Sequence, residues 1–141
     1  MRSEVDARKA QEEDRWAIWK WFQDCAARRA WHRDAVLDRE AYKTWFNQIM
    51  TAPDHLLLIG VVGTIRIGIV RFDRQSPDVW RASLMLRLAF WGQNYGTRLL
   101  SVAIDRLQEY EPVGTVVMAP SLITEPVRRM VTACGITLEA R

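Results

Sequence analysis

The hydrophobic positions in the N-terminal part of the chain follow a helical period. After a short alternating segment at 5–10, apolar residues recur at helical spacing from Trp16 to Trp21. Asp38 is a residue type that caps helices, and Pro53 ends the run that follows it. Four apolar positions of this second run share one helix face: Tyr42, Trp45, Phe46 and Ile49. The pattern predicts one strand followed by two helices.

From residue 55 the period changes to that of strands. Two β-rich runs, 55–60 and 63–72, are joined at 61–63 and predict a hairpin. A turn containing Pro77 is predicted at 73–78, and another strand at 79–88. The rest of the chain predicts, in order, a loop at 91–96, a helix at 97–110, a strand at 113–119, a helix at 125–134 and a short strand at 136–138.

This order of elements indicates one fold class. Antiparallel strands followed by a strand–helix–strand crossover give a mixed, mostly antiparallel sheet with helices on both faces. We therefore expect an α/β (α+β) fold. The length of 141 residues is typical of one domain, and no linker or repeat divides it. A single domain over residues 1–141 is predicted.

Composition excludes several classes of protein. With 49% hydrophobic and 26% charged residues, the chain reads as a folded domain. No apolar stretch is long enough for a membrane span or a signal peptide, which predicts a cytoplasmic protein without a membrane partner. Cys25 and Cys134 lie far apart and form no metal-binding spacing, so neither a metal site nor a disulfide is expected.

The net charge of +3 comes from one region of the chain. Residues 1–55 and 96–141 each carry equal numbers of basic and acidic side chains, and the excess lies in 56–95. The arginines of that region are Arg66, Arg71, Arg74, Arg81 and Arg87. A local excess of this kind suits a small anionic ligand better than a nucleic acid, although a solvated strand surface explains it equally well. No nucleic-acid partner is expected.

The most informative stretch runs from 84 to 100, a strand, a tight loop and the start of a helix. The first amides of a helix lack intrahelical partners and lie at the positive end of the helix dipole, so they can bind an anion. Gly92 and Gly96 allow the backbone to approach a phosphate closely, and Asn94 tolerates a left-handed conformation. The stretch predicts an anion site.

The same stretch resembles the pyrophosphate-binding loop of the GNAT superfamily of N-acetyltransferases. That pattern is Arg/Gln-x-x-Gly-x-Gly/Ala, followed by two residues and a Leu-Leu pair. If Leu99-Leu100 is taken as this pair, Gly96 matches the last signature position. Trp91 and Asn94 occupy the first two positions and depart from the pattern. The resemblance covers almost the whole chain and implies a GNAT-like sheet with its C-terminal strands truncated.

The resemblance implies acetyl-CoA as the cofactor. Its pantetheine arm would pair with the strand around Arg87, its pyrophosphate would bind at the loop, and Arg87 and Arg98 are candidates for the outer phosphates. Surface charge is the alternative explanation for both arginines. The implied cofactor-binding residues are Leu86, Arg87, Leu88, Trp91, Gly92, Gln93, Asn94, Tyr95, Gly96, Thr97, Arg98 and Thr124.

Candidate catalytic groups are scarce. No Asp or Glu lies between Asp78 and Asp105, where many members of the superfamily place a base. In the superfamily, the general acid is usually a Tyr on the last helix, seven residues after an Asn. The corresponding positions in this chain are Val131 for the Tyr and Thr124 for the Asn. Tyr95 and Tyr42 remain as candidate catalytic phenols, although a tyrosine at either position more often has a packing role.

For the acceptor, the implied binding residues are Arg28, His32 and Trp45, in the region that closes over the acceptor in this superfamily. Aromatic rings there could stack on a sugar or could simply be core. The segment 68–73 is most similar to enzymes that acetylate amino-sugar nucleotides for surface polysaccharides. Alternatives are another small amine, a protein N-terminus, or a fold that binds coenzyme A or a protein without catalysis. The truncated C-terminal strands would leave one edge of the sheet exposed, and an exposed edge favours association, which predicts a homodimer.

Overall fold

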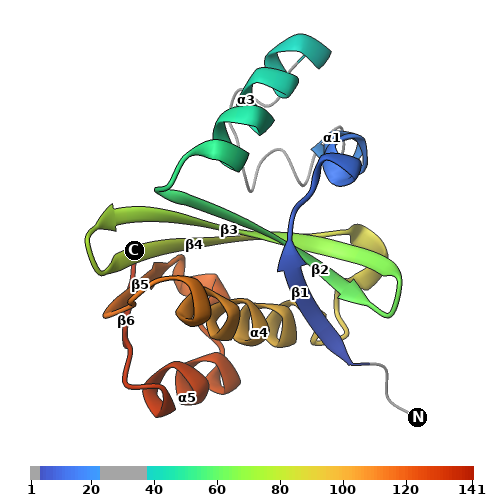
Figure 1. The fold of residues 1–141 in the computed structure, drawn as a ribbon. Helices are drawn as coiled ribbons and strands as arrows, with labels where there is room; N and C mark the ends of the chain where they lie inside the picture. Colours follow the sequence, from blue (N-terminus) through green and yellow to red (C-terminus); the bar gives the residue numbers. More distant parts are fainter. Residues whose placement is uncertain (1–3, 23–37) are drawn as a thin grey trace.

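The computed structural model describes residues 4–22 and 38–141, and its elements alternate largely as the sequence predicts (Figure 1). The helices are α1 (Arg15–Phe22), α3 (Arg39–Thr51), α4 (Tyr95–Tyr110) and α5 (Glu125–Ala133). The strands are β1 (Val5–Lys9), β2 (His55–Val62), β3 (Ile65–Ser76), β4 (Val79–Leu86), β5 (Thr115–Met118) and β6 (Thr137–Ala140). Short 3-10 turns lie at Glu12–Asp14, Leu88–Phe90 and Pro120–Leu122.

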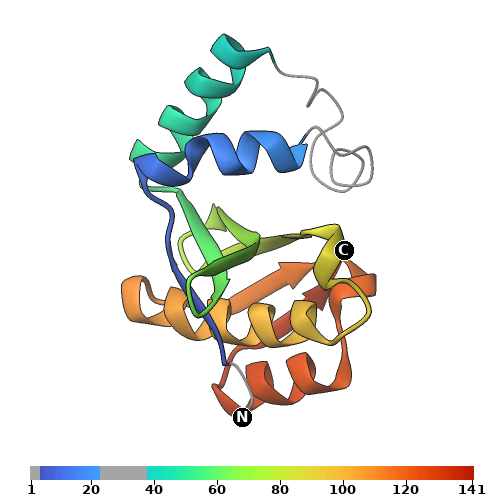
Figure 2. The ribbon, with the colours of Figure 1, turned by 90° about the vertical axis from the view of Figure 1, so that its right-hand side faces the viewer.

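One six-stranded sheet forms the centre of the molecule, with the strands in the order β1 to β6. Strands β1 to β4 pair antiparallel, and the β4–β5 and β5–β6 pairs are parallel. Helices α1 and α3 lie on one side of the sheet, and α4 and α5 on the other (Figures 1 and 2). The expected mixed, mostly antiparallel sheet with helices on both faces is confirmed.

Each face of the sheet buries its own hydrophobic cluster. On the α4 and α5 side, the apolar face of α4 packs on β1 to β5, as its spacing predicts. On the other side, Tyr42, Phe46 and Ile49 of α3 pack with Ile18 of α1 against the sheet. Asp38 caps α3, because its Oδ1 accepts a hydrogen bond of 2.7 Å from the amide of Ala41. The predicted cap and helix face are thus both confirmed.

Several predicted boundaries are wrong by a few residues. The first hairpin turns at Gly63 and Thr64 instead of 61–63, because Gly63 adopts a φ of +60° that suits a tight turn. Strand β3 continues to Ser76, so the predicted turn at 73–78 is reduced to Pro77 and Asp78. Strand β4 ends at Leu86 and not at residue 88, because Leu88–Phe90 coil into a 3-10 turn.

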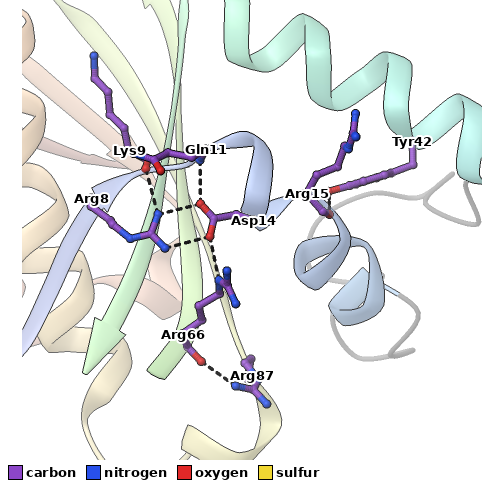
Figure 3. Close-up of polar contacts among 8 residues, drawn as sticks. All are labelled: Arg8, Lys9, Gln11, Asp14, Arg15, Tyr42, Arg66 and Arg87. Atoms are coloured by element: carbon purple, nitrogen blue, oxygen red, sulfur yellow. Dashed lines mark hydrogen bonds and ion pairs between the residues drawn. The ribbon is translucent and has the colours of Figure 1, made fainter. Parts of the chain in front are cut away.

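A buried carboxylate ties the N-terminal elements to the sheet (Figure 3). The Asp14 side chain is fully buried and accepts hydrogen bonds from Arg8 at 2.8 and 2.9 Å and from Arg66 Nε at 2.8 Å. The Gln11 amide donates to it at 2.7 Å. Burial raises the pKa of Asp14, but the hydrogen bonds from Arg8, Gln11 and Arg66 outweigh that effect and lower the pKa to about 2. The ionised carboxylate therefore anchors the start of α1 to β1 and β3.

Two features of the described residues concern membranes and metals. Within residues 4–22 and 38–141, no helix is both long and apolar enough to cross a membrane. In the same part of the chain, no group of three His, Cys, Asp or Glu side chains could hold a metal ion.

Candidate functional site

The sheet opens between β4 and β5. These strands pair over only three positions, from Val79 opposite Thr115 to Arg81 opposite Val117. Beyond Arg81, β4 continues to Leu86 beside β3 alone, while β5 ends at Met118 and the chain coils at Pro120–Leu122. The second half of β4 therefore has a strand neighbour on one side only among the described residues.

Backbone groups of this half of β4 face the opening. The amide of Arg87 donates to the carbonyl of Ile67 at 2.9 Å, and Leu86 lies opposite Gly68. In an antiparallel pair this places the N–H and C=O of Leu86, and of Leu84 two residues earlier, on the side away from β3. The Leu86 carbonyl accepts a hydrogen bond of 2.7 Å from Trp91 Nε1. Within residues 4–22 and 38–141, the two N–H groups and the Leu84 carbonyl have no strand partner.

The opening continues as a cavity of about 640 Å³ that reaches the loop before α4. Its walls come from β4, from the loop and start of α4, and from the turn after β5. The lining residues are Leu84, Met85, Leu86, Trp91, Gly92, Asn94, Gly96, Thr97, Ser121 and Leu122. An open strand edge and a helix start thus share one cavity.

The loop adopts the conformation that its residue types favour. Gly92 has a φ of +75°, and Asn94 has a φ of +63° as the N-cap of α4. The amide of Arg98 donates to the carbonyl of Asn94, so the N–H groups of residues 95–97 precede the first helical bond. A Cβ at Gly96 would lie 3.3 Å from Leu84 Cδ2. Glycine here lets the first turn of α4 approach β4, and the amides at the helix start can receive an anion.

A second cavity, of about 250 Å³, lies against the end of β4 and α1. Its lining residues are Lys20, Trp21, Met85, Leu86, Arg87, Leu88, Ala89 and Trp91. Met85, Leu86 and Trp91 also line the larger cavity. The two cavities therefore meet at the end of β4, and we call them the loop cavity and the α1-side cavity.

The structure brings half of the predicted cofactor-binding residues together. Six of the twelve line the loop cavity: Leu86, Trp91, Gly92, Asn94, Gly96 and Thr97. Arg87 and Leu88 line only the α1-side cavity. Both come directly after the last residue of β4, where the chain leaves the strand. Gln93 donates from its side chain to the carbonyl of Ala89 at 3.3 Å and lines neither cavity.

Three further predicted residues pack behind the loop. Tyr95 stacks edge-on against Phe90 with ring centres 5.4 Å apart. The Arg98 guanidinium lies 4.7 Å from the Tyr95 ring centre, and its buried Nε has no hydrogen-bond partner among the described residues. Thr124 caps α5, and its hydroxyl lies 3.2 Å from that of Thr97. Thr124 is thus linked through Thr97 to the loop cavity, but does not line it.

Tyr42 lies in the core and not in a cavity. It is fully buried, its hydroxyl donates to the Arg15 carbonyl at 2.5 Å, and its ring packs beside Trp16, Trp45 and Phe46. Burial raises the pKa of the phenol, which makes it a poorer acid. The geometry favours the packing role that the sequence leaves open for this residue.

Replacing Tyr42 by Phe should therefore reduce stability and leave turnover unchanged. The substitution leaves the Arg15 carbonyl without its hydroxyl donor, which costs about 1 kcal/mol. Chemical denaturation of both proteins checks the cost, and steady-state kinetics check the turnover. A fall in kcat of tenfold or more, with the fold intact, would return Tyr42 to the list of catalytic candidates.

The predicted acceptor residues are only partly described. Arg28 and His32 lie outside the described residues, as do Cys25 and Trp31. Trp45 is half-buried on α3, with its ring centre 5.7 Å from that of Tyr42 and 5.8 Å from the Arg71 guanidinium. It packs at the edge of the core between α3 and the sheet and lines neither of the two cavities.

Sequence reasoning missed seven residues that line the cavities. Leu84, Met85 and Ala89 lie within the stretch 84–100, and the other four lie outside it. Ser121 and Leu122 reach the loop cavity because β5 lies beside β4, a neighbourhood that the predicted crossover implied. Lys20 and Trp21 reach the α1-side cavity because α1 crosses the end of β4. No spacing in the sequence connects α1 with β4, so only the tertiary structure could find these two.

Comparisons with known proteins agree on the kind of domain. A family model described as "Acetyltransferase (GNAT) domain" matches residues 5–137. No curated protein matches the chain significantly by sequence. A solved spermidine N-acetyltransferase from Vibrio cholerae, in complex with CoA and spermine, superposes with a TM-score of 0.66 at 11% identity. That match covers 72% of this chain and 62% of the other, so the chain spans less than two thirds of that enzyme.

Two other solved structures have the same fold. The aminoglycoside acetyltransferase AAC(6')-Ib, in complex with coenzyme A and kanamycin, has a TM-score of 0.71 at 16% identity, covering 84% of this chain and 76% of its own. RimL, a ribosomal L7/L12 alpha-N-protein acetyltransferase in complex with coenzyme A, has a TM-score of 0.61 at 14% identity, covering 74% and 64%. At such identities the likeness establishes the fold, which is the one that the sequence resemblance implies.

Proposed function

The chain belongs to the GNAT acetyltransferase family, and from this premise we propose that it transfers the acetyl group of acetyl-CoA to the amine of a small acceptor. The observation that carries the proposal is the loop cavity, where the unpaired half of β4 leads directly to the start of α4. An elongated molecule with amide groups at one end and phosphates at the other has complementary partners along this path.

The residues of the loop cavity fit coenzyme A. The main-chain amides at 95–97, with the left-handed turns at Gly92 and Asn94, form a concave donor surface for the pyrophosphate. The free N–H and C=O groups of Leu84 and the N–H of Leu86 would pair with the amides of the pantetheine arm, as a strand would. Arg98, one turn into α4, is proposed to reach the outer phosphates with the free end of its guanidinium.

The two cavities meet where the reaction would occur. Bound acetyl-CoA supplies a thioester, whose carbon accepts the lone pair of the acceptor amine as the new C–N bond forms and the C–S bond breaks. The thiolate gains one proton and the amine loses one, so the products are an amide and free coenzyme A. We propose that an N–H on the open edge of β4 donates to the thioester oxygen.

A general base is missing from the cavity walls. Among the described residues, neither cavity is lined by an Asp or Glu. We propose that the acceptor enters as the neutral amine and that solvent takes its proton. Holding the two reactants in the right geometry can alone lower the barrier by several kcal/mol. Tyr95 remains the candidate general acid, because its neighbours Asn94 and Gly96 both line the loop cavity.

For the acceptor, we propose an amino sugar carried on a nucleotide. The support is the sequence resemblance at 68–73 and the aromatic and cationic side chains on the α1 side of the sheet. Spermidine and aminoglycosides, named for the solved enzymes above, are alternatives of the same reaction type. A homodimer, formed through an edge of the sheet, is also proposed, and light scattering at micromolar concentration tests it.

Two measurements test the proposed function. Calorimetric titration with acetyl-CoA should show one binding event per chain, and thiol release should follow when an amine panel of amino-sugar nucleotides, polyamines and aminoglycosides is added. Absence of binding refutes the acetyl-CoA site. Binding without release from any amine refutes the transferase and indicates a fold that binds coenzyme A without catalysis.

A further inference from the structure

The described residues that line the α1-side cavity carry positive charge and include no acidic side chain. Lys20 of α1 and Arg87 at the end of β4 contribute an ammonium and a guanidinium to its lining. Trp21 and Trp91 contribute aromatic rings. Neither cation has an ion pair with a described carboxylate, so both charges are available to a ligand.

Arg87 is held in place while its charge stays uncompensated. Its Nη1 donates to the Arg66 carbonyl at 2.7 Å, which fixes the side chain without neutralising it. Its guanidinium lies 5.6 Å from the Trp21 ring centre and 5.8 Å from that of Phe90. A fixed planar guanidinium beside aromatic rings can bind an oxyanion through two parallel N–H donors.

Two carboxylates on this side of the sheet are already occupied. Asp14 is buried and bound by Arg8 and Arg66 (Figure 3). Asp73 accepts a hydrogen bond from Arg71 Nε at 2.8 Å and pairs with His55 at 2.5 Å. The described residues that line the cavity include Lys20 and Arg87 and no carboxylate, so a polycation with several ammonium groups would meet like charge there.

We infer that the α1-side cavity is the acceptor site and that it selects amines carrying an acidic group, a phosphate or a carboxylate, which lies against Lys20 and Arg87. This inference rests on the proposed function and specifies the class of its substrate. The cavity meets the loop cavity at Met85, Leu86 and Trp91, so an acceptor held there by its anion has its amine directed to the open edge of β4. Cations nearby also disfavour the ammonium form of the amine, which suits a site whose described lining residues include no Asp or Glu as a base.

A matched series of amines tests the selectivity. Glucosamine, glucosamine 6-phosphate and the 6-carboxylate of glucosamine share one amine and differ only in the acidic group, and spermine serves as the polycation. With saturating acetyl-CoA, thiol release should give a kcat/KM about tenfold or more higher for the acidic sugars than for glucosamine, with spermine lowest. The ratio of kcat/KM for glucosamine 6-phosphate to that for the 6-carboxylate identifies which acidic group the site prefers.

The variant Lys20→Glu should abolish this preference and favour spermine. The matched control is Lys43→Glu, an exposed lysine of α3 that lines neither cavity, and it should leave the preference unchanged. Acetyl-CoA binding by calorimetry should be the same in both variants and the wild type, which shows that the fold is intact. An unchanged preference in Lys20→Glu, or wild-type protein that prefers spermine, overturns the inference.

A binding measurement separates failure of this inference from failure of the proposed function. Glucosamine 6-phosphate is titrated into the protein saturated with coenzyme A, and the affinity is compared between wild type and Lys20→Glu. Binding that depends on Lys20 without thiol release supports the anion site and refutes the transferase. Thiol release without Lys20-dependent binding supports the transferase and refutes the anion site. Absence of both refutes both.

Discussion

Replacing Gly96 by Glu should abolish acetyl-CoA binding. Gly96 lies in the first turn of α4 and lines the loop cavity, and a Cβ there would point toward Leu84 and Leu86. The substitution adds a carboxylate at the proposed phosphate position and fills the approach to the open strand. We expect Kd for acetyl-CoA to rise at least about hundredfold, close to 3 kcal/mol. Isothermal calorimetry measures the change.

Two control variants at the same position separate charge from size. Gly96→Gln has nearly the size of Glu without the charge and should bind better than Gly96→Glu by about tenfold or more. Gly96→Ala adds only a methyl, 3.3 Å from a Leu84 methyl that can move, and should stay within a few-fold of wild type. Equal affinity of wild type and Gly96→Glu would show that the phosphates bind elsewhere.

The second large effect is expected at Asp14, where Asp14→Asn should destabilise the fold by about 2 to 3 kcal/mol. The variant removes the charge that pairs with Arg8 and Arg66, while its side-chain oxygen can still accept from the Gln11 amide. Both arginine side chains are more than a third exposed, at 38% for Arg8 and 35% for Arg66, so water compensates part of the loss. Thermal and urea unfolding measure the difference.

The pH dependence of stability follows from the same carboxylate. Its pKa is about 2 in the fold against 3.8 unfolded, so its contribution is fully present above about pH 4. The contribution is lost as the pH falls from about 4 toward 2, and amounts to about 2 kcal/mol. In Asp14→Asn this part of the acid unfolding curve should be absent.

Asp6→Asn is the matched control for both measurements. Asp6 pairs with Arg106 at the surface, where water and salt weaken the interaction, so the loss of stability should be much smaller. A loss as large as that of Asp14→Asn would show that net charge, and not the buried network, is responsible.

The loop cavity was predictable in part because its central residues are contiguous. A strand, a glycine-containing loop and an amphipathic helix follow one another between Leu84 and Leu100, and local rules locate all three. The opposite wall, Ser121 and Leu122, depends on how β5 departs from β4 after three paired positions. No local pattern encodes that divergence, because it results from packing across the sheet.

The α1-side cavity shows the same limit more strongly. Its cations come from α1 and from the end of β4. Contacts distant in the sequence hold α1 there: the Asp14 network anchors its start to β1 and β3, and Ile18 packs in the same hydrophobic cluster as Met85 of β4. The arginines of the excess at 56–95 divide between roles. Arg66 and Arg71 pair with Asp14 and Asp73, while Arg87 keeps its charge for the cavity.

The early parting of β4 and β5 has a thermodynamic consequence. The second half of β4 has backbone groups without a strand partner among the described residues. A ligand that forms hydrogen bonds with these groups acts as an additional strand. Because such a ligand binds only the folded chain, its concentration becomes a determinant of folding. At a hundred times its Kd the ligand would add about 2.7 kcal/mol to the free energy of unfolding. The melting temperature would then rise with the concentration of free coenzyme.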